Sequence, residues 1–296
     1  MALSSRNGPR WLERINCGCK INLRLKVTAR RKDKLHELSS CFLFLEHPGD
    51  ELVVESSAGG LSLISPGYPE LAGKNNLLWK AAEAYAAAAG IAPQWQITLD
   101  KQVPVAAGLG GGSADAGGLL ALLNSRYSAL SESDLNRLAF SLGADVPFFL
   151  NRRAAWVTGA GENIEFLPEL PEIPQILIVN PGFPVSAAWA YTHMAPALIG
   201  ADLPEFKAEL IAGRITDWQS FCRNDLAPAL WKKFPLLGSI RDSLRDSGAL
   251  AVQVSGSGSS LFALFDRNDL QPAARQLRRR FAGENKFRIF AGGKEF

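Results

Sequence analysis

The segment from Pro104 to Ala116 constrains this chain most, because four of the five residues from Gly108 to Gly112 are glycine. Glycines leave backbone N–H groups accessible, and the apolar stretch that follows is typical of a helix, whose N-terminus adds unpaired donors and a positive dipole end. Each glycine costs up to ~1 kcal/mol relative to alanine, so a plain flexible turn would weaken the fold without compensation. The pattern predicts a loop that binds phosphate oxygens.

This loop differs from the familiar phosphate-binding sequences. No lysine follows Gly112, as the common phosphate loop requires, and Ser113 stands where the dinucleotide fingerprint has its third glycine. The His-Arg-Asp and Asp-Phe-Gly signatures of protein kinases are absent. We expect Ser113 to cap the following helix, or alternatively to reach a magnesium ion, and Asp115 to have a structural role in the first turn.

Residues 20–27 alternate between polar and apolar side chains, which is the two-residue period of a strand with one buried face. Lys20 and Asn22 therefore share the polar face, about 7 Å apart at ~3.3 Å per residue. After a basic turn, residues 35–45 predict a second strand. Residues 76–89 predict an alanine-rich helix that ends at Gly90, and a helix from about residue 113 to 124 follows the glycine-rich loop.

Three prolines between Pro168 and Pro174 indicate a boundary between two regions. Beyond them, residues 175–179 predict a strand, and residues 249–265 predict two strands joined by a Gly/Ser turn. Mixed helices and strands in both halves favour an α+β protein with two lobes, residues 17–170 and 171–296. Residues 1–16 contain three arginines and no apolar secretory core, which favours a disordered extension or an early start codon over a transit peptide.

Composition argues against several functions. The formal net charge is +3, and the basic runs 30–32 and 278–280 are too short for the concentrated basic face that nucleic acid requires. No apolar run approaches the ~20 residues that cross a bilayer. Cys17 and Cys19 are too close for the usual zinc spacing, so these two and Cys41 and Cys222 are predicted to be buried or half-buried thiols. A reducing compartment, the cytoplasm, is expected.

Four ordered motifs resemble the GHMP kinases, a family named for galactokinase, homoserine kinase, mevalonate kinase and phosphomevalonate kinase. They are Lys20-Ile-Asn-Leu with His36-Glu-Leu, the loop from Pro104 to Ala114, Leu142-Gly-Ala-Asp-Val-Pro-Phe-Phe, and Val254-Ser-Gly-Ser-Gly-Ser. Asn224-Asp-Leu also fits. The resemblance runs from about residue 17 to the end, and it is strongest to members that phosphorylate a cytidine diphosphate sugar alcohol.

The resemblance implies an N-terminal lobe like ribosomal protein S5 domain 2 and a ferredoxin-like C-terminal lobe, with ATP and substrate in the cleft between them. It implies that ATP, with Mg²⁺ present, phosphorylates the 2-hydroxyl of 4-diphosphocytidyl-2-C-methyl-D-erythritol in the methylerythritol phosphate route to isoprenoids. The expected partner is thus a small molecule, with no nucleic acid and no membrane. The chain is expected to be a monomer or homodimer, and the sequence assigns no metal ligand.

The same resemblance assigns roles to individual residues. Asp145 is implied as the catalytic base and Lys20 as its partner, while Asn22 and His36 bind the substrate, His36 through the cytosine ring. An aspartate can accept the hydroxyl proton or orient the hydroxyl, and a lysine can keep it ionised and balance charge on the transferred group. The ATP-binding residues implied are Asn76, Lys101, Pro104, Val105, Ala106, Ala107, Gly108, Leu109, Gly110, Gly111, Gly112, Ser113 and Ala114.

Leu35 departs from the family pattern, which usually has a tyrosine before the histidine to stack on cytosine. Stacking on an aromatic ring contributes roughly 0.5–1.5 kcal/mol beyond burial, and Leu35 can supply only apolar cover. Phe42, Phe44 and Phe183 are candidates to replace the missing ring.

Other functions stay open. A sibling GHMP kinase that acts on a different alcohol would carry the same motifs. A nucleotide-binding regulator without catalysis is disfavoured because both Lys20 and Asp145 are retained. An RNA-binding module, suggested by the ribosomal-protein-like lobe, is disfavoured by the near-neutral total charge.

Overall fold

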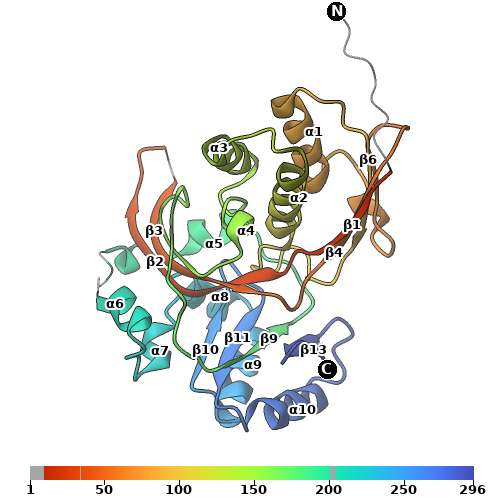
Figure 1. Ribbon diagram of the computed structural model, residues 1–296. Coiled ribbons are helices and arrows are strands. Elements are labelled where there is room, and N and C mark those ends of the chain that lie inside the picture. The colour runs from red at the N-terminus through yellow and green to blue at the C-terminus, as the bar shows by residue number, and fades with distance from the viewer. Residues whose placement is uncertain (1–9, 34, 201, 203–204) are drawn as a thin grey trace, which may run out of the picture.

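The computed structural model describes residues 10–33, 35–200, 202 and 205–296. The amino-terminal lobe consists of β1 (Leu12–Asn16), β2 (Cys19–Arg30), β3 (His36–Leu45), β4 (Glu51–Ser56), β5 (Ser62–Ile64), η1 (Pro69–Leu71), α1 (Leu77–Ala89), β6 (Trp95–Asp100), α2 (Gly111–Tyr127), α3 (Glu132–Leu142), α4 (Phe148–Asn151), β7 (Ala155–Gly159) and β8 (Asn163–Phe166). Figure 1 shows this lobe above the carboxy-terminal one.

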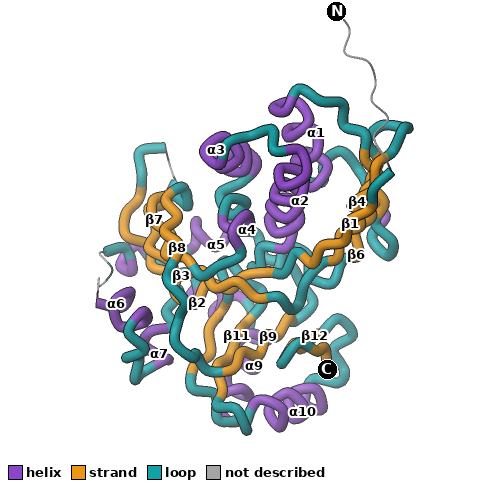
Figure 2. Tube along the Cα trace, viewed as in Figure 1, coloured by secondary structure: helices purple, strands orange, loops and turns teal. Residues whose placement is uncertain are grey.

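The carboxy-terminal lobe follows a connection over residues 167–174. It consists of β9 (Gln175–Asn180), α5 (Ala187–His193), η2 (Pro196–Leu198), α6 (Glu205–Ile211), α7 (Trp218–Phe221), α8 (Ala227–Lys233), α9 (Pro235–Asp246), β10 (Ala251–Val254), β11 (Leu261–Phe265), α10 (Leu270–Arg280), β12 (Arg288–Ala291) and β13 (Lys294–Glu295). The predicted α+β class with two lobes is confirmed (Figure 2).

Two four-stranded sheets form the amino-terminal lobe, in the orders β1-β4-β6-β5 and β2-β3-β7-β8. Side chains from both sheets and from helices α1 to α4 share one apolar core, which includes Tyr85, Trp95 and Phe148. Strand β1 pairs antiparallel with β4, so the expected disorder of residues 1–16 is wrong for residues 12–16. Residues 1–9 lie outside the described part of the chain.

The sheet of the carboxy-terminal lobe has the order β10-β11-β9-β12-β13, and every neighbouring pair is antiparallel. Its first four strands follow the chain order strand–helix–strand–strand–helix–strand, with β11 and β9 in the centre, which is the ferredoxin-like arrangement. Helices α9 and α10 pack on one face of this sheet through a core that includes Ile240, Leu244 and Leu277. The ferredoxin-like expectation is therefore confirmed.

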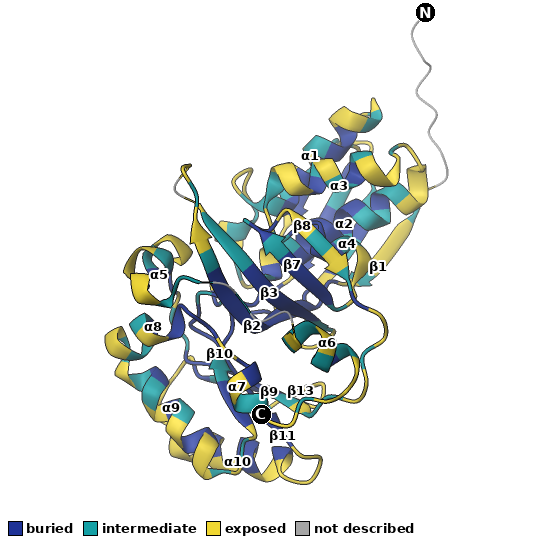
Figure 3. Ribbon diagram, turned by 90° about the vertical axis from the view of Figure 1, so that its left-hand side faces the viewer, coloured by how far each residue is buried: buried dark blue, intermediate teal, exposed yellow. Residues whose placement is uncertain are grey.

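The opposite face of that sheet packs against β2 and β3 and joins the lobes through a shared apolar core. Ile21 and Leu43 contribute from one side, and Ile178, Phe262 and Leu264 from the other. Figure 3 shows β2 and β3 buried in the middle of the molecule, while the helices expose their outer faces. The predicted strand at residues 20–27 is thus an interior strand, covered from both sides.

The side chains of β2 do not alternate between the two faces of the sheet along the whole strand, as the sequence predicts. Asn22 pairs with Phe42 but Arg24 pairs with Cys41, so one extra residue, Leu23, is inserted as a β-bulge. An extra residue inverts the alternation of side chains beyond it. Consequently the apolar residues of β2 divide between two clusters, and Leu25 joins a separate one with residues of α5.

The polar side chains of β2 are buried as well. Lys20, Asn22, Arg24 and Lys26 are all 7% exposed or less, so the expectation of a strand with only one buried face is wrong. Beyond the bulge, Arg24 forms an ion pair with Asp202, and Lys26 forms one with a buried aspartate of the carboxy-terminal lobe. Before the bulge, Lys20 and Asn22 face a different set of groups, which is described below.

The shared core should make the lobes depend on each other for stability. Phe262 is fully buried in that core, so Phe262→Ala is expected to lower the free energy of unfolding by about 3–5 kcal/mol, through lost burial and the cavity left behind. Urea unfolding followed by fluorescence measures this change. The matched control is Phe140→Ala, because Phe140 is 44% exposed, and a loss of similar size there would contradict the assignment.

Candidate functional site

The glycine-rich loop and the start of α2 border a pocket of about 290 Å³. Most residues predicted to bind ATP line it. The members of the predicted set are Asn76, Lys101, Pro104, Val105, Ala106, Ala107, Gly108, Gly110, Gly111, Gly112 and Ser113. Two other predicted residues do not line it, because Leu109 is buried in the shared core and Ala114 in the amino-terminal core.

Helix α2 begins at Gly111, two residues earlier than expected, and Gly110 is its N-cap with no side-chain cap hydrogen bond. The favoured expectation that Ser113 caps the helix is therefore wrong. The N–H groups of the first turn have no acceptor within the helix, which suits an anion at this end. Asn76, by contrast, caps α1: its Oδ1 accepts a hydrogen bond from the N–H of Leu78 at 2.9 Å.

The loop is held in place through its carbonyl oxygens. Four successive residues each accept a hydrogen bond from outside the loop: Ala106 from Val185 N (3.3 Å), Ala107 from Ser260 N (3.0 Å), Gly108 from Ser255 Oγ (2.9 Å) and Leu109 from Lys20 N (2.9 Å). Three of the four donors belong to the carboxy-terminal lobe. Both lobes therefore fix the shape of the phosphate loop.

Gly108 shows why this position requires glycine. Its φ is +79°, a conformation that other residues rarely adopt, and a Cβ there would lie 2.1 Å from the carbonyl oxygen of Ser255. The close approach lets the Ser255–Ser260 turn, which the sequence predicted between β10 and β11, reach the loop. The side chain of Asn224 fixes this turn: its Nδ2 donates hydrogen bonds to the carbonyl oxygens of Val254 (2.8 Å) and Gly256 (2.7 Å).

Lys101 lies beneath the loop and is paired with two buried carboxylates. Its Nζ contacts Asp50 Oδ2 and lies 2.9 Å from Asp115 Oδ2. Asp50 Oδ1 also accepts from the N–H groups of Gln102 and Val103. This cluster ties the start of β4, the end of β6 and the second turn of α2 together, which agrees with a structural role for Asp115. The expected place of Asp115 in the first turn is wrong, because α2 begins two residues earlier than expected.

The charges in this cluster shift one another's titration. Burial raises the pKa of the Asp115 carboxyl to about 8; the Lys101 ammonium opposes the rise and the Asp50 carboxylate adds to it. Burial lowers the pKa of Lys101, but Asp115 and Asp50 together outweigh that effect, so its net shift is upward. The Oδ1 atom of Asp115 is buried with no hydrogen-bond partner among the described residues.

Lys20 and Asp145 meet beside the loop, as the motifs implied. Lys20 Nζ lies 3.5 Å from Asp145 Oδ2, and a Cβ on Gly110 would lie 3.1 Å from Lys20 Cγ. Asp145 sits in the turn between α3 and α4, where its side chain is 35% exposed, whereas that of Lys20 is 6% exposed. The pair thus combines a buried cation with a carboxylate that a substrate can reach.

Asn22 lies beside this pair and contacts the lysine directly. Its Oδ1 accepts a hydrogen bond from Lys20 Nζ at 2.5 Å, and its backbone N–H donates to Ser255 Oγ at 3.3 Å. The ring of Phe42, a candidate for base stacking, instead lies 4.5 Å from Lys20 Nζ. Phe44, another candidate, packs edge-on against Phe149.

The aromatic partner of His36 comes from the other lobe, and sequence reasoning missed it. The ring of Tyr191, on α5, stacks on His36 with centroids 5.1 Å apart and planes at 21°. Burial, with Arg30 nearby, lowers the pKa of His36, which keeps the imidazole neutral near pH 7. Burial also raises the pKa of Tyr191, and the charge of Asp145 adds to that rise, so this ring lies within electrostatic range of Asp145.

Two other expected contributors are Leu35 and Phe183. Leu35 is 53% exposed in the turn before β3 and directly precedes His36. Phe183 packs against Phe234 in the carboxy-terminal lobe, with the two rings tilted to each other. A signal for Tyr191 was present in the sequence only as one aromatic residue of a short amphipathic segment, which does not reveal its partner.

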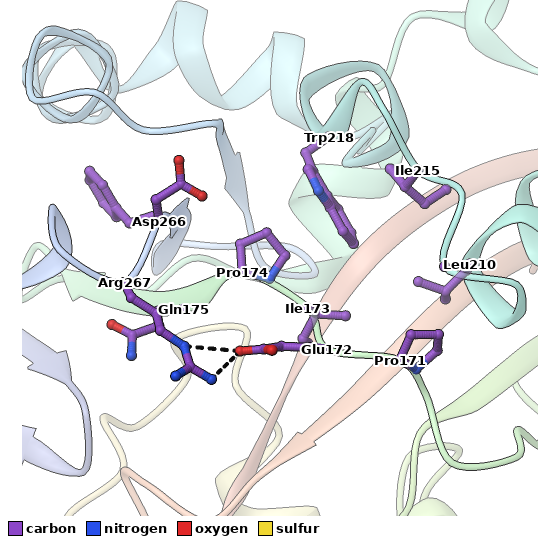
Figure 4. A pocket seen from close by; sticks show the side chains of 12 residues that line it. Pro171, Glu172, Ile173, Pro174, Gln175, Leu210, Ile215, Trp218, Asp266 and Arg267 are labelled. Carbon is purple, nitrogen blue, oxygen red and sulfur yellow. Dashed lines mark hydrogen bonds and ion pairs between the residues drawn. The ribbon is translucent and has the colours of Figure 1, made fainter.

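A further pocket, of about 290 Å³, lies between the 171–175 connection and the carboxy-terminal lobe. Figure 4 shows Trp218 and Pro174 beside it, with Glu172 and Arg267 bonded to each other. None of the predicted site residues line it, so the pocket at the glycine-rich loop is the candidate site. Among the described residues, all four cysteines are buried free thiols, as predicted, and none of the helices is long and apolar enough to cross a membrane.

Comparison with known proteins identifies the class. The family model "GHMP kinases N terminal domain" matches residues 76–153, and "GHMP kinases C terminal" matches residues 206–283. The fold supports the same class: homoserine kinase from Cytophaga hutchinsonii aligns with a TM-score of 0.72 over 100% of both chains, at 16% identity. The two lobes and the loop at α2 therefore define a GHMP kinase.

Relatives define the family within this class. The 4-diphosphocytidyl-2-C-methyl-D-erythritol kinase of Nitratidesulfovibrio vulgaris is 38% identical over 89% of this chain and 94% of its own length, and that of Granulibacter bethesdensis is 40% identical over 87% of each. A crystal structure of 4-(cytidine 5'-diphospho)-2C-methyl-D-erythritol kinase aligns with a TM-score of 0.79 at 36% identity, covering 94% of this chain and 98% of that one. The chain belongs to the 4-diphosphocytidyl-2-C-methyl-D-erythritol kinase family.

The cluster beneath the loop predicts a pH-dependent effect of Lys101→Met. Without the ammonium, two buried carboxylates face each other, so the free energy of unfolding should fall by about 3–5 kcal/mol at pH 8.5. The loss should be smaller at pH 5.5, because burial raises the pKa of folded Asp115 to about 8 against the opposing Lys101 ammonium, and removal of that ammonium raises the pKa further above the ordinary value of 3.8. A raised folded pKa means that stability falls as pH rises toward it, so the variant should still be losing stability above pH 8, where the wild type no longer does.

Urea unfolding of the ligand-free protein at both pH values measures this effect. Lys80→Met is the matched control, because Lys80 is exposed on α1 and its replacement should change stability by about 0.5 kcal/mol or less. Equal losses at the two pH values would show that Asp115 does not titrate in this range.

Proposed function

We propose that this chain transfers the γ-phosphoryl group of ATP to the 2-hydroxyl of 4-diphosphocytidyl-2-C-methyl-D-erythritol, in the methylerythritol phosphate route to isoprenoids. Relatives of 38% and 40% identity carry the name of that kinase over nearly their whole length. The reaction is placed in the cytoplasm, a reducing compartment, which agrees with four buried free thiols.

The observation that carries the proposal is the contact between Lys20 and Asp145 beside the phosphate loop. In phosphoryl transfer the enzyme acts mainly by positioning and by electrostatic stabilisation. Asp145, partly exposed, can accept the proton of the acceptor hydroxyl or align that oxygen with the phosphorus atom. Lys20, buried beside it, balances the negative charge on the transferred group.

ATP is proposed to bind in the pocket at the loop, with its phosphates at the N-terminus of α2. Four loop carbonyls are engaged elsewhere, while the N–H groups of the first turn of α2 are available for phosphate oxygens. Asn76 and Leu77 line the far part of the same pocket and are proposed to lie near the nucleoside. Lys101 supports the loop from below, because its ammonium is already engaged by two carboxylates.

Mg²⁺ usually binds proteins through one or two groups plus substrate phosphates, and it supplies charge neutralisation to the phosphoryl group. The residues at the loop fit such an ion: Ser113 lines the pocket in the first turn of α2, and it does not serve as the helix cap. Its hydroxyl is the group proposed to reach the metal.

His36 and Tyr191 are proposed to hold the cytosine ring. They come from different lobes, their rings are stacked, and Tyr191 lies within electrostatic range of Asp145. The two rings are already in contact with each other, so a base would pack beside them. There it gains stacking from Tyr191, which replaces the tyrosine absent at Leu35. Neutral His36 can donate one hydrogen bond and accept another at the base edge.

Asp145→Asn is expected to lower kcat by about 10²- to 10⁴-fold, because the amide cannot accept the hydroxyl proton. ATP affinity should stay within about twofold, since Asp145 does not line the nucleotide pocket. The measurement is ADP release that depends on 4-diphosphocytidyl-2-C-methyl-D-erythritol, with ATP binding measured separately by calorimetry. Asp246→Asn, at an exposed position at the end of α9, is the control and should retain full activity.

Three results would overturn the proposal in different ways. Unaltered turnover of Asp145→Asn would remove this residue from the mechanism. Turnover of mevalonate or homoserine, with none of the cytidylyl substrate, would assign the chain to a sibling activity. ATP binding without turnover of any alcohol would favour a regulator.

Tyr191→Ala is expected to raise the KM for the cytidylyl substrate about tenfold, because one stacking surface and its buried area are lost. The KM for ATP should not change. Tyr191→Phe keeps the ring and should stay within about twofold of the wild type. Steady-state kinetics with each substrate varied in turn distinguish these outcomes, and equal effects of both variants would show that the hydroxyl, not the ring, matters.

A further inference from the structure

The side-chain amide of Asn22 is fixed by two hydrogen bonds: its oxygen accepts one and its NH₂ group donates the other. Its Oδ1 accepts from Lys20 Nζ at 2.5 Å, and its Nδ2 donates to Ser40 Oγ at 3.0 Å. Ser40 Oγ in turn donates to the carbonyl oxygen of Arg24 at 2.6 Å. Asn22 is 2% exposed and Ser40 is 0% exposed, so no water replaces a missing partner at low cost.

The donor and the acceptor in each of these hydrogen bonds are determined by the chemical groups involved. A lysine ammonium has donors only, so the Asn22 atom that faces Lys20 must be the amide oxygen. The NH₂ group then points to Ser40, whose oxygen must accept, and whose own proton is left for an acceptor. The carbonyl of Arg24 is such an acceptor, since a carbonyl never donates.

The β-bulge provides this acceptor. Asn22 pairs with Phe42 and Arg24 pairs with Cys41, so the inserted residue lies between the two ends of the hydrogen-bond chain. Ser40, on the neighbouring strand, reaches both Asn22 Nδ2 and the carbonyl of Arg24 across the bulge. A regular strand pair would not bring these three groups together in the same way.

We propose that Ser40 is a positioning residue for phosphoryl transfer: its hydroxyl orients the Asn22 amide, and the amide oxygen directs Lys20 toward Asp145. The inference rests on the proposed function, because it assumes that Lys20 and Asp145 form the catalytic pair. Ser40 itself contacts neither Lys20 nor the nucleotide pocket.

Removal of the hydroxyl would leave the NH₂ group of Asn22 buried without its acceptor. The amide then lacks one of its two fixed contacts and can move out of its present plane, so its oxygen no longer holds the ammonium of Lys20 in one direction. The backbone contact of Lys20 with Leu109 does not involve this side chain, so the phosphate loop keeps its shape. The effect should therefore fall on kcat and spare the KM for ATP.

Ser40→Ala is expected to lower kcat about tenfold, with the KM for ATP within about twofold of the wild type. Ser40→Thr retains the hydroxyl and should restore most of the activity. The matched control is Ser243→Ala: Ser243 is also buried and also donates to a backbone carbonyl, of Ser239 at 2.7 Å, but it lies on α9. That variant should keep full kcat.

A double-mutant cycle with Asn22→Ala separates positioning from a purely structural role. If Ser40 acts through the Asn22 amide, adding Ser40→Ala to Asn22→Ala should change kcat by less than about twofold. If Ser40 only supports the bulge, it should cost the same factor in both backgrounds. That second result, or a Ser40→Ala kcat within about twofold of the wild type, would overturn the inference while leaving the proposed function intact.

A readout that does not need turnover is the side-chain amide of Asn22 in ¹⁵N-asparagine-labelled protein, assigned from its loss in Asn22→Ala. Its protons should exchange slowly with water in the wild type and in Ser243→Ala, and much faster in Ser40→Ala. Unchanged exchange in Ser40→Ala would overturn the inference even if the chain proved inactive on the cytidylyl substrate, a result that would separately overturn the proposed function.

Discussion

Strand β2 is removed from water on both faces, and the organisation of the site follows from that condition. A buried polar group is costly unless it is paired, and a buried charge more so. Each polar side chain of β2 from Lys20 to Lys26 accordingly has a defined partner from a different segment of the chain. The pairs on one side of the bulge include Lys20 and Asp145, which we propose as the catalytic pair, and those on the other side attach the carboxy-terminal lobe.

Two lysines of similar burial illustrate how partners decide roles. Lys101 is held between Asp50 and Asp115, which neutralise it and leave it to support the phosphate loop. Lys20 contacts an amide oxygen and, at 3.5 Å, a carboxylate that remains partly open to solvent. Its charge is therefore less fully compensated, which agrees with the proposed role of Lys20 toward a transferred phosphoryl group. The fixed loop and the exposed carboxylate together give a site that is preorganised around a single open position.

Much of this could be predicted from the sequence. Local composition identified the phosphate loop, because Gly108 and its neighbours are unusual in any other role, and the spaced motifs identified Lys20 and Asp145. The sequence predictions that proved wrong or incomplete concern features that depend on tertiary structure. The bulge at Leu23 does not interrupt the alternation of polar and apolar residues in the sequence. The sequence therefore gives no sign that side chains after Asn22 point to the opposite face of the sheet. Tyr191 was missed because its partner, His36, is in the other lobe.

Errors at helix ends have a similar origin. Ser113 was favoured as a cap because serine often caps helices, but here the helix starts two residues earlier, at glycines that usually oppose helix formation. The contacts of the loop with the other lobe outweigh that local preference. Strand β1 falls within residues 1–16, for which the absence of an apolar secretory core favours a disordered extension or an early start codon. Its pairing with β4 is a tertiary contact that this composition does not reveal.

The approach of Ser255 to Gly108 has a consequence for how such genes can recombine. The hydroxyl of Ser255 joins the phosphate loop to β2, and the tight contact leaves no room for a side chain at Gly108. A chimaera that takes one lobe from a distant relative would combine a loop and a Ser255 turn from different proteins, and their shapes need not be complementary. Productive crossovers between homologous genes should therefore inherit the loop, the strand and the turn from one parent, as a single unit drawn from three separate stretches of coding sequence.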